Sequence, residues 1–292
     1  MPAQGSTLAL RALGRRLYTL RKKADISQGY AASILGISPQ TMGRVEEGLS
    51  ARSASDLYMN TLCDLYNAPQ DERRLILALA HEVRVIAKRG GGWWRAHLDQ
   101  GPVDFDPYTV VEGAANRLTI WAVIVLPAIV RTPDYTRAMT WTLHPNEPTD
   151  QNEERIQRAL KQQRSLDDPD LTVEIILSEA ALREEWGGSA VMAEQRRHLA
   201  EIAQRPNVTI RVVPFTTRHH LGPLVGPFSL MEFPPMSKSR MTHPPIVHIE
   251  GYAGDLYLER FEEVSHYKAA IPELRRAALT ETDSRALLLH EN

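Results

Sequence analysis

The chain has 292 residues, 43% of them hydrophobic and 24% charged, which is the composition of a globular protein large enough for two domains. A single cysteine, Cys63, excludes an internal disulfide framework and any cysteine-based zinc site. No segment reaches the roughly 18 apolar residues of a membrane span and the N-terminus lacks a signal-peptide pattern, so we expect a cytoplasmic protein with no membrane partner.

The net charge of −2 conceals an asymmetry between the two halves of the chain. Residues 1–92 contain 13 Lys and Arg against 8 Asp and Glu, whereas residues 93–292 contain 21 against 28. A basic front half joined to an acidic back half favours a front half that meets a polyanion. Chance variation of surface charge is the alternative interpretation.

Leucines that recur at intervals of three and four residues predict an amphipathic first helix over 8–24. Its apolar stripe consists of Leu10, Leu13, Leu17 and Leu20. The other faces carry no acid and six basic side chains, namely Arg11, Arg15, Arg16, Arg21, Lys22 and Lys23. Such a helix packs through one side and attracts anions on the other.

The next two helices are short and are separated by glycine. A second helix is predicted over 27–35, with a serine as its N-cap, and Gly36 ends it. A third helix is predicted over 38–47, with Pro39 as its first helical residue and Gly48 as its stop signal. Proline at that position marks the start of a helix and does not break it.

Two further helices complete an all-α N-terminal domain. The fourth is predicted to begin at Ser53 and the fifth to cover about 70–88. The apolar side of the fourth consists of Leu57, Leu62 and Leu65. A glycine run at 90–92 predicts a linker, which divides the chain into domains at 1–89 and 93–292.

The second and third helices meet the requirements of a helix-turn-helix unit. A small residue must let the helices approach, a turn residue must tolerate positive φ, and apolar residues must anchor the second helix while its other face enters the major groove. Ala32 is the small residue and Gly36 the turn residue, followed by the apolar Ile37. Met42 and Val45 are the apolar pair that anchors the second helix.

The stretch ISQGYAASILGISPQTMGRVEEG, residues 26–48, resembles the XRE family of transcription regulators. The resemblance covers about residues 8–70 and implies a five-helix DNA-binding domain of the lambda-repressor type. It further implies a sequence-specific regulator whose partner is double-stranded DNA and whose location is the nucleoid.

The resemblance implies contacts to DNA phosphates from residues around the motif. Gln28 matches a phosphate-contacting position at the start of the second helix, where the helix N-terminus adds partial positive charge. Arg21 and Arg52 match flanking positions that approach phosphates, and Ser38 lies at the start of the third helix. For Arg52, a solvated loop charge is the alternative.

The third helix is predicted to read bases through Gln40 and Arg44, because glutamine pairs with adenine and arginine with guanine. Thr41 serves either a base or a phosphate. For Arg44, the alternatives are an ion pair with Glu47 or a phosphate contact. Gly43 costs helix stability and offers no side chain, and its role stays open. This reading face is sparse, so DNA shape is expected to contribute to specificity.

The back half predicts an α+β domain with a mixed sheet. Expected helices cover about 107–122, 133–142, 150–165, 189–204 and 262–279. Expected strands, rich in β-branched and aromatic residues, cover 171–177, 208–215, 226–233 and 244–250. The strand, helix and strand over 171–215 predict a βαβ unit.

Several stretches of this half, among them ILSEAALREEWGG (176–188) and LAEIAQRPNVTIRVVPF (199–215), resemble the uncharacterised C-terminal domain of a group of actinobacterial XRE regulators. The resemblance implies a role in developmental or secondary-metabolite control, and a small partner protein. The stretch LPAIVRT departs from it at Ala128 and Arg131, where relatives tend to carry Gly and Gln.

No constellation of catalytic or metal-binding residues stands out in the back half. His219 and His220 are adjacent and have no acidic partner nearby. His243 and His248 lack a third ligand, and Ser178 lacks the glycine elbow of a nucleophile. We therefore expect no enzyme, no metal and no cofactor, and the sequence identifies no ligand-binding residue.

Two functions are open for the back half. In the first, it is a sensor that binds a small molecule or a partner protein and shifts DNA affinity, which requires two states that bind the effector differently. In the second, as in antitoxin-like regulators, it is a platform for dimerisation and protein partners with no small ligand. A homodimer is expected under both, because a single third helix covers too few base pairs for useful specificity.

Overall fold

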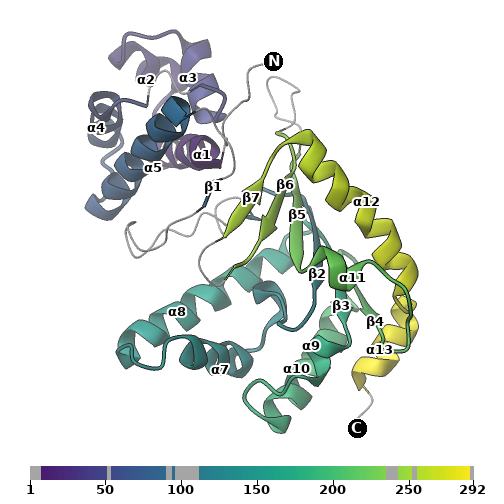
Figure 1. Cartoon of the computed structure of the whole chain (residues 1–292). Coiled ribbons are helices and arrows are strands. Elements are labelled where there is room, and N and C mark those ends of the chain that lie inside the picture. The colour runs from purple at the N-terminus through teal and green to yellow at the C-terminus, as the bar shows by residue number, and fades with distance from the viewer. Residues whose placement is uncertain are drawn as a thin grey trace. The chain divides into compact units, whose positions relative to one another are not determined.

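The structure, a computed structural model, describes residues 8–50, 54–89, 94–95, 112–234, 243–251 and 255–289 (Figure 1). The chain forms two compact units. The first contains residues 1–114, 235–241 and 251–259, and the second contains residues 115–234, 242–250 and 260–292.

The first unit contains five helices, which confirms the all-α N-terminal fold. They are α1 (Leu8–Lys23), α2 (Gln28–Ile34), α3 (Pro39–Glu46), α4 (Asp56–Leu65) and α5 (Gln70–Arg89). Their core includes Leu13 and Leu17 of α1, Met42 of α3 and Met59 of α4, all with 2% exposure or less. Each buried side chain of this size contributes about 1.5–3 kcal/mol to folding, so the helices are held mainly by this shared core.

The start of α4 differs from the prediction. The helix begins at Asp56, and its N-cap is Ser55, whose hydroxyl accepts a hydrogen bond from the Tyr58 N–H. Leu57, predicted to be buried, is 73% exposed, and Met59 occupies the core instead. Leu57 lies five residues before the buried Leu62, which is about 140° around a helix of 3.6 residues per turn, so the two leucines cannot share one face. Ser53 itself lies outside the described residues.

The first unit also contains a short strand pair. Strand β1 (Trp94–Arg95) runs antiparallel to β7 (Leu256–Leu258), with Trp94 opposite Tyr257. The glycine run 90–92, predicted to be a linker, lies outside the described residues.

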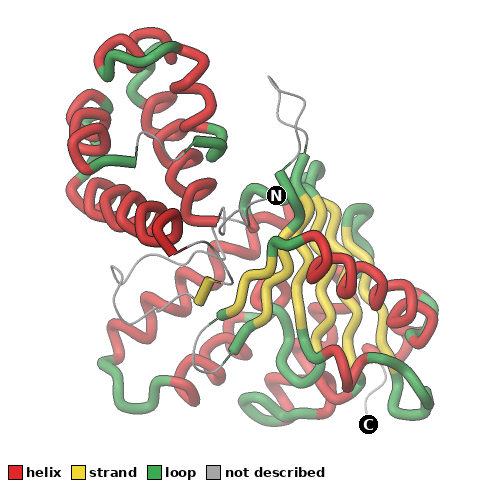
Figure 2. Tube along the Cα trace, turned by 45° about the horizontal axis from the view of Figure 1, so that its top comes forward, coloured by secondary structure: helices red, strands yellow, loops and turns green. Residues whose placement is uncertain are grey.

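The second unit is built on the mixed sheet that the sequence predicted. Its strands are β2 (Arg117–Ala122), β3 (Thr172–Ser178), β4 (Val208–Val213), β5 (Phe228–Glu232) and β6 (Ile246–Ile249). They lie side by side in the order β6-β5-β2-β3-β4 (Figure 2). The pairs β2·β3 and β3·β4 are parallel, whereas β2·β5 and β5·β6 are antiparallel.

Helices flank this sheet. They are α7 (Pro133–Leu143), α8 (Thr149–Gln162), α9 (Ala180–Arg183), α10 (Ser189–Ile202), α11 (Gly222–Val225), α12 (Phe261–Ala277) and α13 (Glu281–Leu289), with short 3₁₀ helices η2 (Ala128–Val130) and η3 (Gln163–Asp167). Helix α10 follows β3 and precedes β4 in the chain, and these two strands pair in parallel, which confirms the βαβ unit. Helix α12 crosses one face of the sheet, where it contacts β4 and β6 (Figure 2).

One predicted helix of the back half is wrong. Residues 117–122, assigned to a helix over 107–122, form β2, and residues 107–111 lie outside the described part of the chain. Strand β2 lies in the interior of the sheet between β5 and β3, and five of its six residues are buried, so both of its faces are covered. A strand buried on both faces is continuously apolar, so its sequence lacks the alternation that identifies a half-exposed strand.

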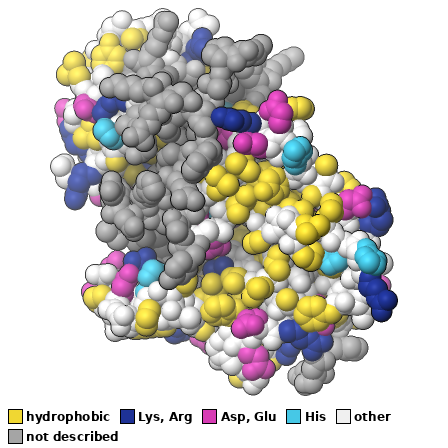
Figure 3. Space-filling model, viewed as in Figure 1, with side chains coloured by type: hydrophobic (Ala, Val, Ile, Leu, Met, Phe, Trp, Pro, Cys, Tyr) yellow, Lys and Arg dark blue, Asp and Glu magenta, His cyan; other side chains and the backbone are white. Residues whose placement is uncertain are grey.

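The surface of the second unit carries large exposed hydrophobic side chains. Leu224 of α11 and Phe261 of α12 are 84% and 81% exposed. Hydrophobic side chains also gather on the face of this unit that is turned to the viewer in Figure 3. Exposed apolar side chains that gather in this way are typical of protein or ligand interaction surfaces.

Candidate nucleic-acid interface

Helices α2 and α3 form the predicted helix-turn-helix. Ala31 and Ala32 of α2 are fully buried, so the two helices approach closely. Gly36 adopts φ 65° in the turn, a left-handed conformation that costs a glycine no steric strain. The next amide, that of Ile37, donates to the Ala32 carbonyl at 3.0 Å and closes the turn.

Serine side chains fix the starts of both helices. Ser27 Oγ accepts from the Tyr30 N–H at 3.1 Å, and Ser38 Oγ accepts from the Thr41 N–H at 3.1 Å. Pro39 occupies the first turn of α3, as predicted. A serine N-cap stabilises a helix by about 1 kcal/mol relative to alanine, so these caps hold two otherwise marginal short helices.

Helix α3 has one buried and one exposed face. Met42 and Val45 are 0% and 3% exposed and anchor the helix in the core. Gln40 and Arg44, four residues apart, are exposed on the same face. No ion pair involves Arg44 among the described residues, so the alternative pairing with Glu47 is not formed. Both predicted reading side chains are thus free to reach out.

The two hydroxyls at the start of α3 contact each other. Ser38 Oγ and Thr41 Oγ1 are 2.9 Å apart, and either oxygen can donate the hydrogen bond. Thr41 is half-buried, whereas Ser38 is exposed. A contact of the Thr41 hydroxyl with a base, or of the Ser38 hydroxyl with a phosphate, would therefore compete with this bond, and Ser38 is the more exposed of the two.

The structure does not place Arg21 on the surface predicted for a phosphate contact. Its side chain is 5% exposed, and its Nε and Nη2 donate to the two carboxylate oxygens of Glu46 at 2.5 and 2.9 Å. Its Nη1 donates to the Ile26 carbonyl at 2.8 Å. This hydrogen bonding raises the pKa of Arg21, even though burial opposes it. Arg21 therefore ties α1 to the end of α3, and its side chain is not available for the phosphate contact that the resemblance implied.

Gln28 keeps a position that suits a phosphate contact, and the structure shows what orients it. Its Nε2 lies 3.4 Å from Glu46 Oε2, within hydrogen-bond distance. The same amide lies against Gly43, where an added Cβ would come within 2.8 Å of it. Gln28 is half-buried in this arrangement. Arg52, the remaining predicted phosphate contact, lies outside the described residues.

Glu46, which the sequence did not single out, positions two of the predicted phosphate-contacting residues. It is buried at 8% exposure and accepts hydrogen bonds from both Arg21 and Gln28. Its burial could be predicted from helical spacing, because Glu46 follows Met42 by four residues and so lies on the buried face of the same short helix. A carboxylate on such a face requires a cationic partner, and the buried arginine of α1 supplies it.

Helix α1 packs on α3 through glycine. A Cβ at Gly14 would lie 2.5 Å from the Val45 carbonyl oxygen and 2.7 Å from that of Glu46. A Cβ at Gly48, whose φ is 66°, would lie 2.7 Å from the Cα of Arg11. The backbones therefore meet without intervening side chains, and the last turn of α3 rests directly on α1.

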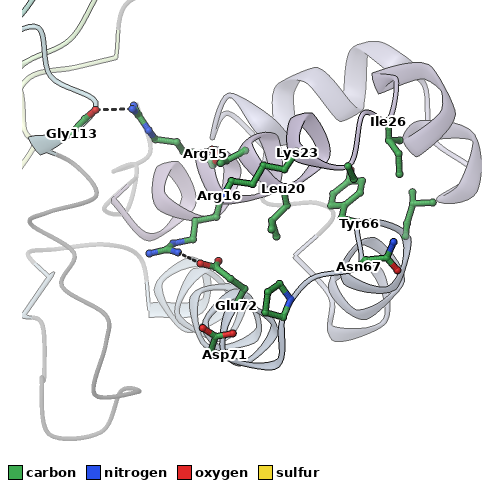
Figure 4. Close-up of a pocket in the computed structure, with 14 residues that line it drawn as sticks. Arg15, Arg16, Leu20, Lys23, Ile26, Tyr66, Asn67, Asp71, Glu72 and Gly113 are labelled. Atoms are coloured by element: carbon green, nitrogen blue, oxygen red, sulfur yellow. Dashed lines mark hydrogen bonds and ion pairs between the residues drawn. The ribbon is translucent and has the colours of Figure 1, made fainter. Parts of the chain in front are cut away.

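A cleft of about 770 Å³ lies between α1, the end of α4 and the start of α5 (Figure 4). In this cleft Arg16 Nη1 donates to Glu72 Oε1 at 2.5 Å, and Arg15 Nη2 donates to the Gly113 carbonyl at 2.6 Å. Burial lowers the pKa of Arg15. The residues that line the cleft include none of the predicted base contacts on α3, so it is separate from the reading face.

Two side chains considered for chemistry in the second unit have structural roles. The ring of His220 lies edge-on to Trp121, with 6.4 Å between centroids, and its Nδ1 accepts from the Gly222 N–H at 3.2 Å. Ser178 Oγ accepts from the Ala180 N–H at 3.3 Å at the end of β3. Within the described ranges, no group of three or more His, Cys, Asp or Glu side chains is placed to hold a metal ion.

None of the helices that the structure describes is long and apolar enough to cross a membrane.

Comparison with protein families agrees with this geometry. Residues 12–76 match the family of helix-turn-helix domains, so the N-terminal unit carries a DNA-binding domain of that class and the chain is a DNA-binding regulator. Residues 105–290, more than half of the chain, match the family described as a domain of unknown function, DUF5753, and the chain belongs to that family. No curated protein and no solved structure matched the chain.

Proposed function

We propose that the protein is a sequence-specific transcription regulator of the XRE type, which places α3, here called the recognition helix, in the major groove of double-stranded DNA. The observation that carries this proposal is the two-sided character of that helix. Met42 and Val45 are buried, whereas Gln40 and Arg44 are exposed side by side. A helix that is anchored by one face and presents polar groups on the other is the arrangement that reads base edges.

Each polar side chain of this interface has a defined role in the proposal. Gln40 forms paired hydrogen bonds with adenine, and Arg44 forms them with guanine. Gln28 and Ser38 contact phosphates at the starts of α2 and α3, and Thr41 contacts a base or a phosphate once it releases Ser38. With only two long side chains for bases, DNA shape contributes to the choice of site.

The regulator acts as a homodimer in this proposal. The recognition helix has eight residues, which corresponds to about 12 Å of helix at the usual rise. Such a length meets only a few base pairs, so a two-fold pair of helices that binds half-sites about 34 Å apart is needed for useful specificity. The exposed hydrophobic side chains of the second unit support a surface for a second copy or another protein.

The second unit modulates DNA binding through a small molecule or a partner protein, as in the actinobacterial regulators of development or secondary metabolism that the sequence resembles. The alternative is an antitoxin-like protein whose second unit is a dimerisation and protein-partner platform with no small ligand. The exposure of Leu224 and Phe261 favours a protein partner. In either case we propose no catalytic activity, and we propose action at the nucleoid.

Selection of duplexes from a random pool tests the DNA-binding proposal. The full chain should enrich a two-fold-symmetric motif, and its affinity for that motif should fall steeply with salt because bound phosphates release counterions. A chain that enriches no motif and shows no salt-dependent affinity for any duplex would overturn the proposal. Two measurements separate the two roles of the second unit: calorimetry against metabolite pools, and co-purification of a small protein encoded beside this one. If no small molecule binds and a protein does, the small-molecule sensor is wrong.

A further inference from the structure

Arg11 is a second buried arginine of α1, and its acidic partner comes from far along the chain. Arg11 Nη2 lies 3.7 Å from Glu259 Oε1, and the two side chains are 7% and 10% exposed. Both residues belong to the first unit. A guanidinium that leaves water requires a nearby opposite charge, so the carboxylate of Glu259 offsets part of the cost of burying Arg11.

Arg11 also supports the end of the recognition helix. The backbone of Gly48, which follows α3, lies so close to α1 that an added Cβ would come within 2.7 Å of Arg11 Cα and 3.2 Å of its Cγ. Movement of the Arg11 side chain therefore changes the surface on which the last turn of α3 rests. Because side chains in such tight packing have little room, small shifts are transmitted to the neighbouring backbone.

The position of Glu259 depends on elements outside the five helices. Glu259 directly follows β7, which pairs with β1, and Tyr257 of that strand is 1% exposed. The next residue, Arg260, is the N-cap of α12, and α12 belongs to the second unit. The covalent chain therefore passes from the carboxylate beside Arg11 to a helix of the second unit within one residue.

We propose that Glu259 is a positioning residue for the recognition helix, acting through Arg11 and Gly48, and that it couples the second unit to DNA binding. The proposal rests on the DNA-binding function proposed above. When the ion pair is formed, the last turn of α3 is supported on α1; when Glu259 withdraws, the buried Arg11 loses this counter-charge and the support weakens. Couplings between two sites in a protein typically change affinity by about 5- to 150-fold.

Hydrogen exchange of the full chain tests the positioning role without DNA. The amides of Glu47, Gly48 and Leu49 donate to carbonyls within α3 and report on its last turn. In Glu259→Gln these amides should exchange roughly fivefold or more faster, while those of α4 keep their protection. Glu262→Gln, an exposed acid three residues along the chain, is the matched control and should leave both sets unchanged. Equal exchange in the two variants would overturn the proposal.

A double variant separates the ion pair from a general loss of folding. Replacing both charges, in Arg11→Met with Glu259→Leu, should restore protection, because two apolar side chains need no counter-charge. Exchange that stays fast in the double variant would show that the ion pair is not the cause. For the duplex selected by the wild-type chain, Glu259→Gln should lower affinity about tenfold and the double variant should recover it.

Hydrogen exchange and duplex affinity test different parts of the proposal, so one part can be wrong while the other holds. If the wild-type chain selects no duplex, the DNA-binding function is wrong, while the exchange result still decides the positioning role. If Glu259→Gln loosens α3 but binds the selected duplex as the wild type does, the coupling to DNA is wrong.

Discussion

The side-chain amide of Gln28 lies against the backbone of Gly43, in space that a Cβ at that position would enter to within 2.8 Å of Nε2. The same amide lies within hydrogen-bond distance of Glu46 Oε2. A larger residue in the middle of the recognition helix would displace Gln28. This explains the glycine whose role the sequence left open, since it leaves room for the residue proposed to meet a phosphate.

Gly43→Ala should therefore separate stability from DNA binding. Alanine favours a helix over glycine by about 1 kcal/mol, and the clash is with the flexible end of Gln28, so the free energy of unfolding should rise by about 0.5–1 kcal/mol. Affinity for all duplexes should fall because Gln28 is displaced. Urea unfolding and duplex titration measure the two effects. Gly29→Ala, where an added Cβ meets nothing within 4 Å, should leave Gln28 in place.

Replacing Arg21 should lower the stability of the protein, whereas replacing Arg44 should hardly change it. Arg21→Met leaves the carboxylate of Glu46 buried without its cationic partner and should lower the free energy of unfolding by about 3 kcal/mol. Arg44→Ala removes an exposed side chain and should change stability by less than about 0.5 kcal/mol. Urea unfolding of the two variants compares them directly. If Arg21→Met were as stable as the wild type, Arg21 would be available for DNA after all.

The DNA contacts should divide into base-reading and phosphate-binding residues. Arg44→Ala and Gln40→Ala should relax base preference at single positions, at a cost of about 1–3 kcal/mol on the preferred site. Gln28→Ala should weaken binding to all sequences and lower the salt slope by about one. Binding to the selected duplex and to its single-base variants, over a range of salt concentrations, measures both. A base preference unchanged by Arg44→Ala would remove that residue from direct readout.

Gly14→Ala should destabilise the first unit although alanine favours a helix. The added methyl group would lie 2.5 Å from the Val45 carbonyl oxygen, and backbone cannot move aside as a flexible side chain can. Overpacking of this kind costs about 1–3 kcal/mol. Thermal unfolding should show a lower Tm for Gly14→Ala and a higher one for Gly43→Ala. Similar Tm shifts in the two variants would contradict the close approach of α1 and α3.

Glu179 should contribute to the acid stability of the second unit. Burial acts to raise the pKa of Glu179, but hydrogen bonds from the Phe215 N–H at 2.9 Å and from Arg183 prevail, and the pKa is lowered. A lowered folded-state pKa means that the contribution is complete above the unfolded value, about 4.5, and is lost as pH falls through the folded value.

The variant Glu179→Gln tests whether the stability contributed by Glu179 is lost as the pH falls. The variant should be less stable than the wild type by about 1 kcal/mol at pH 7, because a charged acceptor is replaced by a neutral one. The difference should shrink as the pH falls below about 4.5. Urea unfolding at a series of pH values measures it. Glu281→Gln, at an exposed ion pair with Arg211, is a suitable control and should show a much smaller difference.

Local signals in the sequence predicted the helix-turn-helix well. Ser27 and Ser38 cap their helices, and Gly36 and Gly48 adopt positive φ, as expected. Each of these features depends on a few consecutive residues, so spacing alone identifies it. The exposure of Gln40 also followed from the period of a helix whose buried face was known.

Features that depend on distant partners were not predictable in the same way. Arg21 is buried against Glu46, which approaches from another helix, whereas its basic side chain on α1 led to the prediction of a phosphate contact. Strand β2 was predicted to be part of a helix because both of its faces are buried, so its sequence shows no apolar–polar alternation, and its partner strands β3 and β5 come later in the chain. Pairing across such distances has no local sequence signature.

The contact between Arg11 and Glu259 also sets an order of events during synthesis. The five helices are complete at Arg89 and their contacts are local in sequence, which favours folding while the rest of the chain is still being made. Glu259 is translated 170 residues after Arg89. A nascent chain that has not yet reached residue 259 would thus present its DNA-binding helices before the carboxylate beside Arg11 is in place, and only a chain that includes Glu259 would carry the proposed coupling.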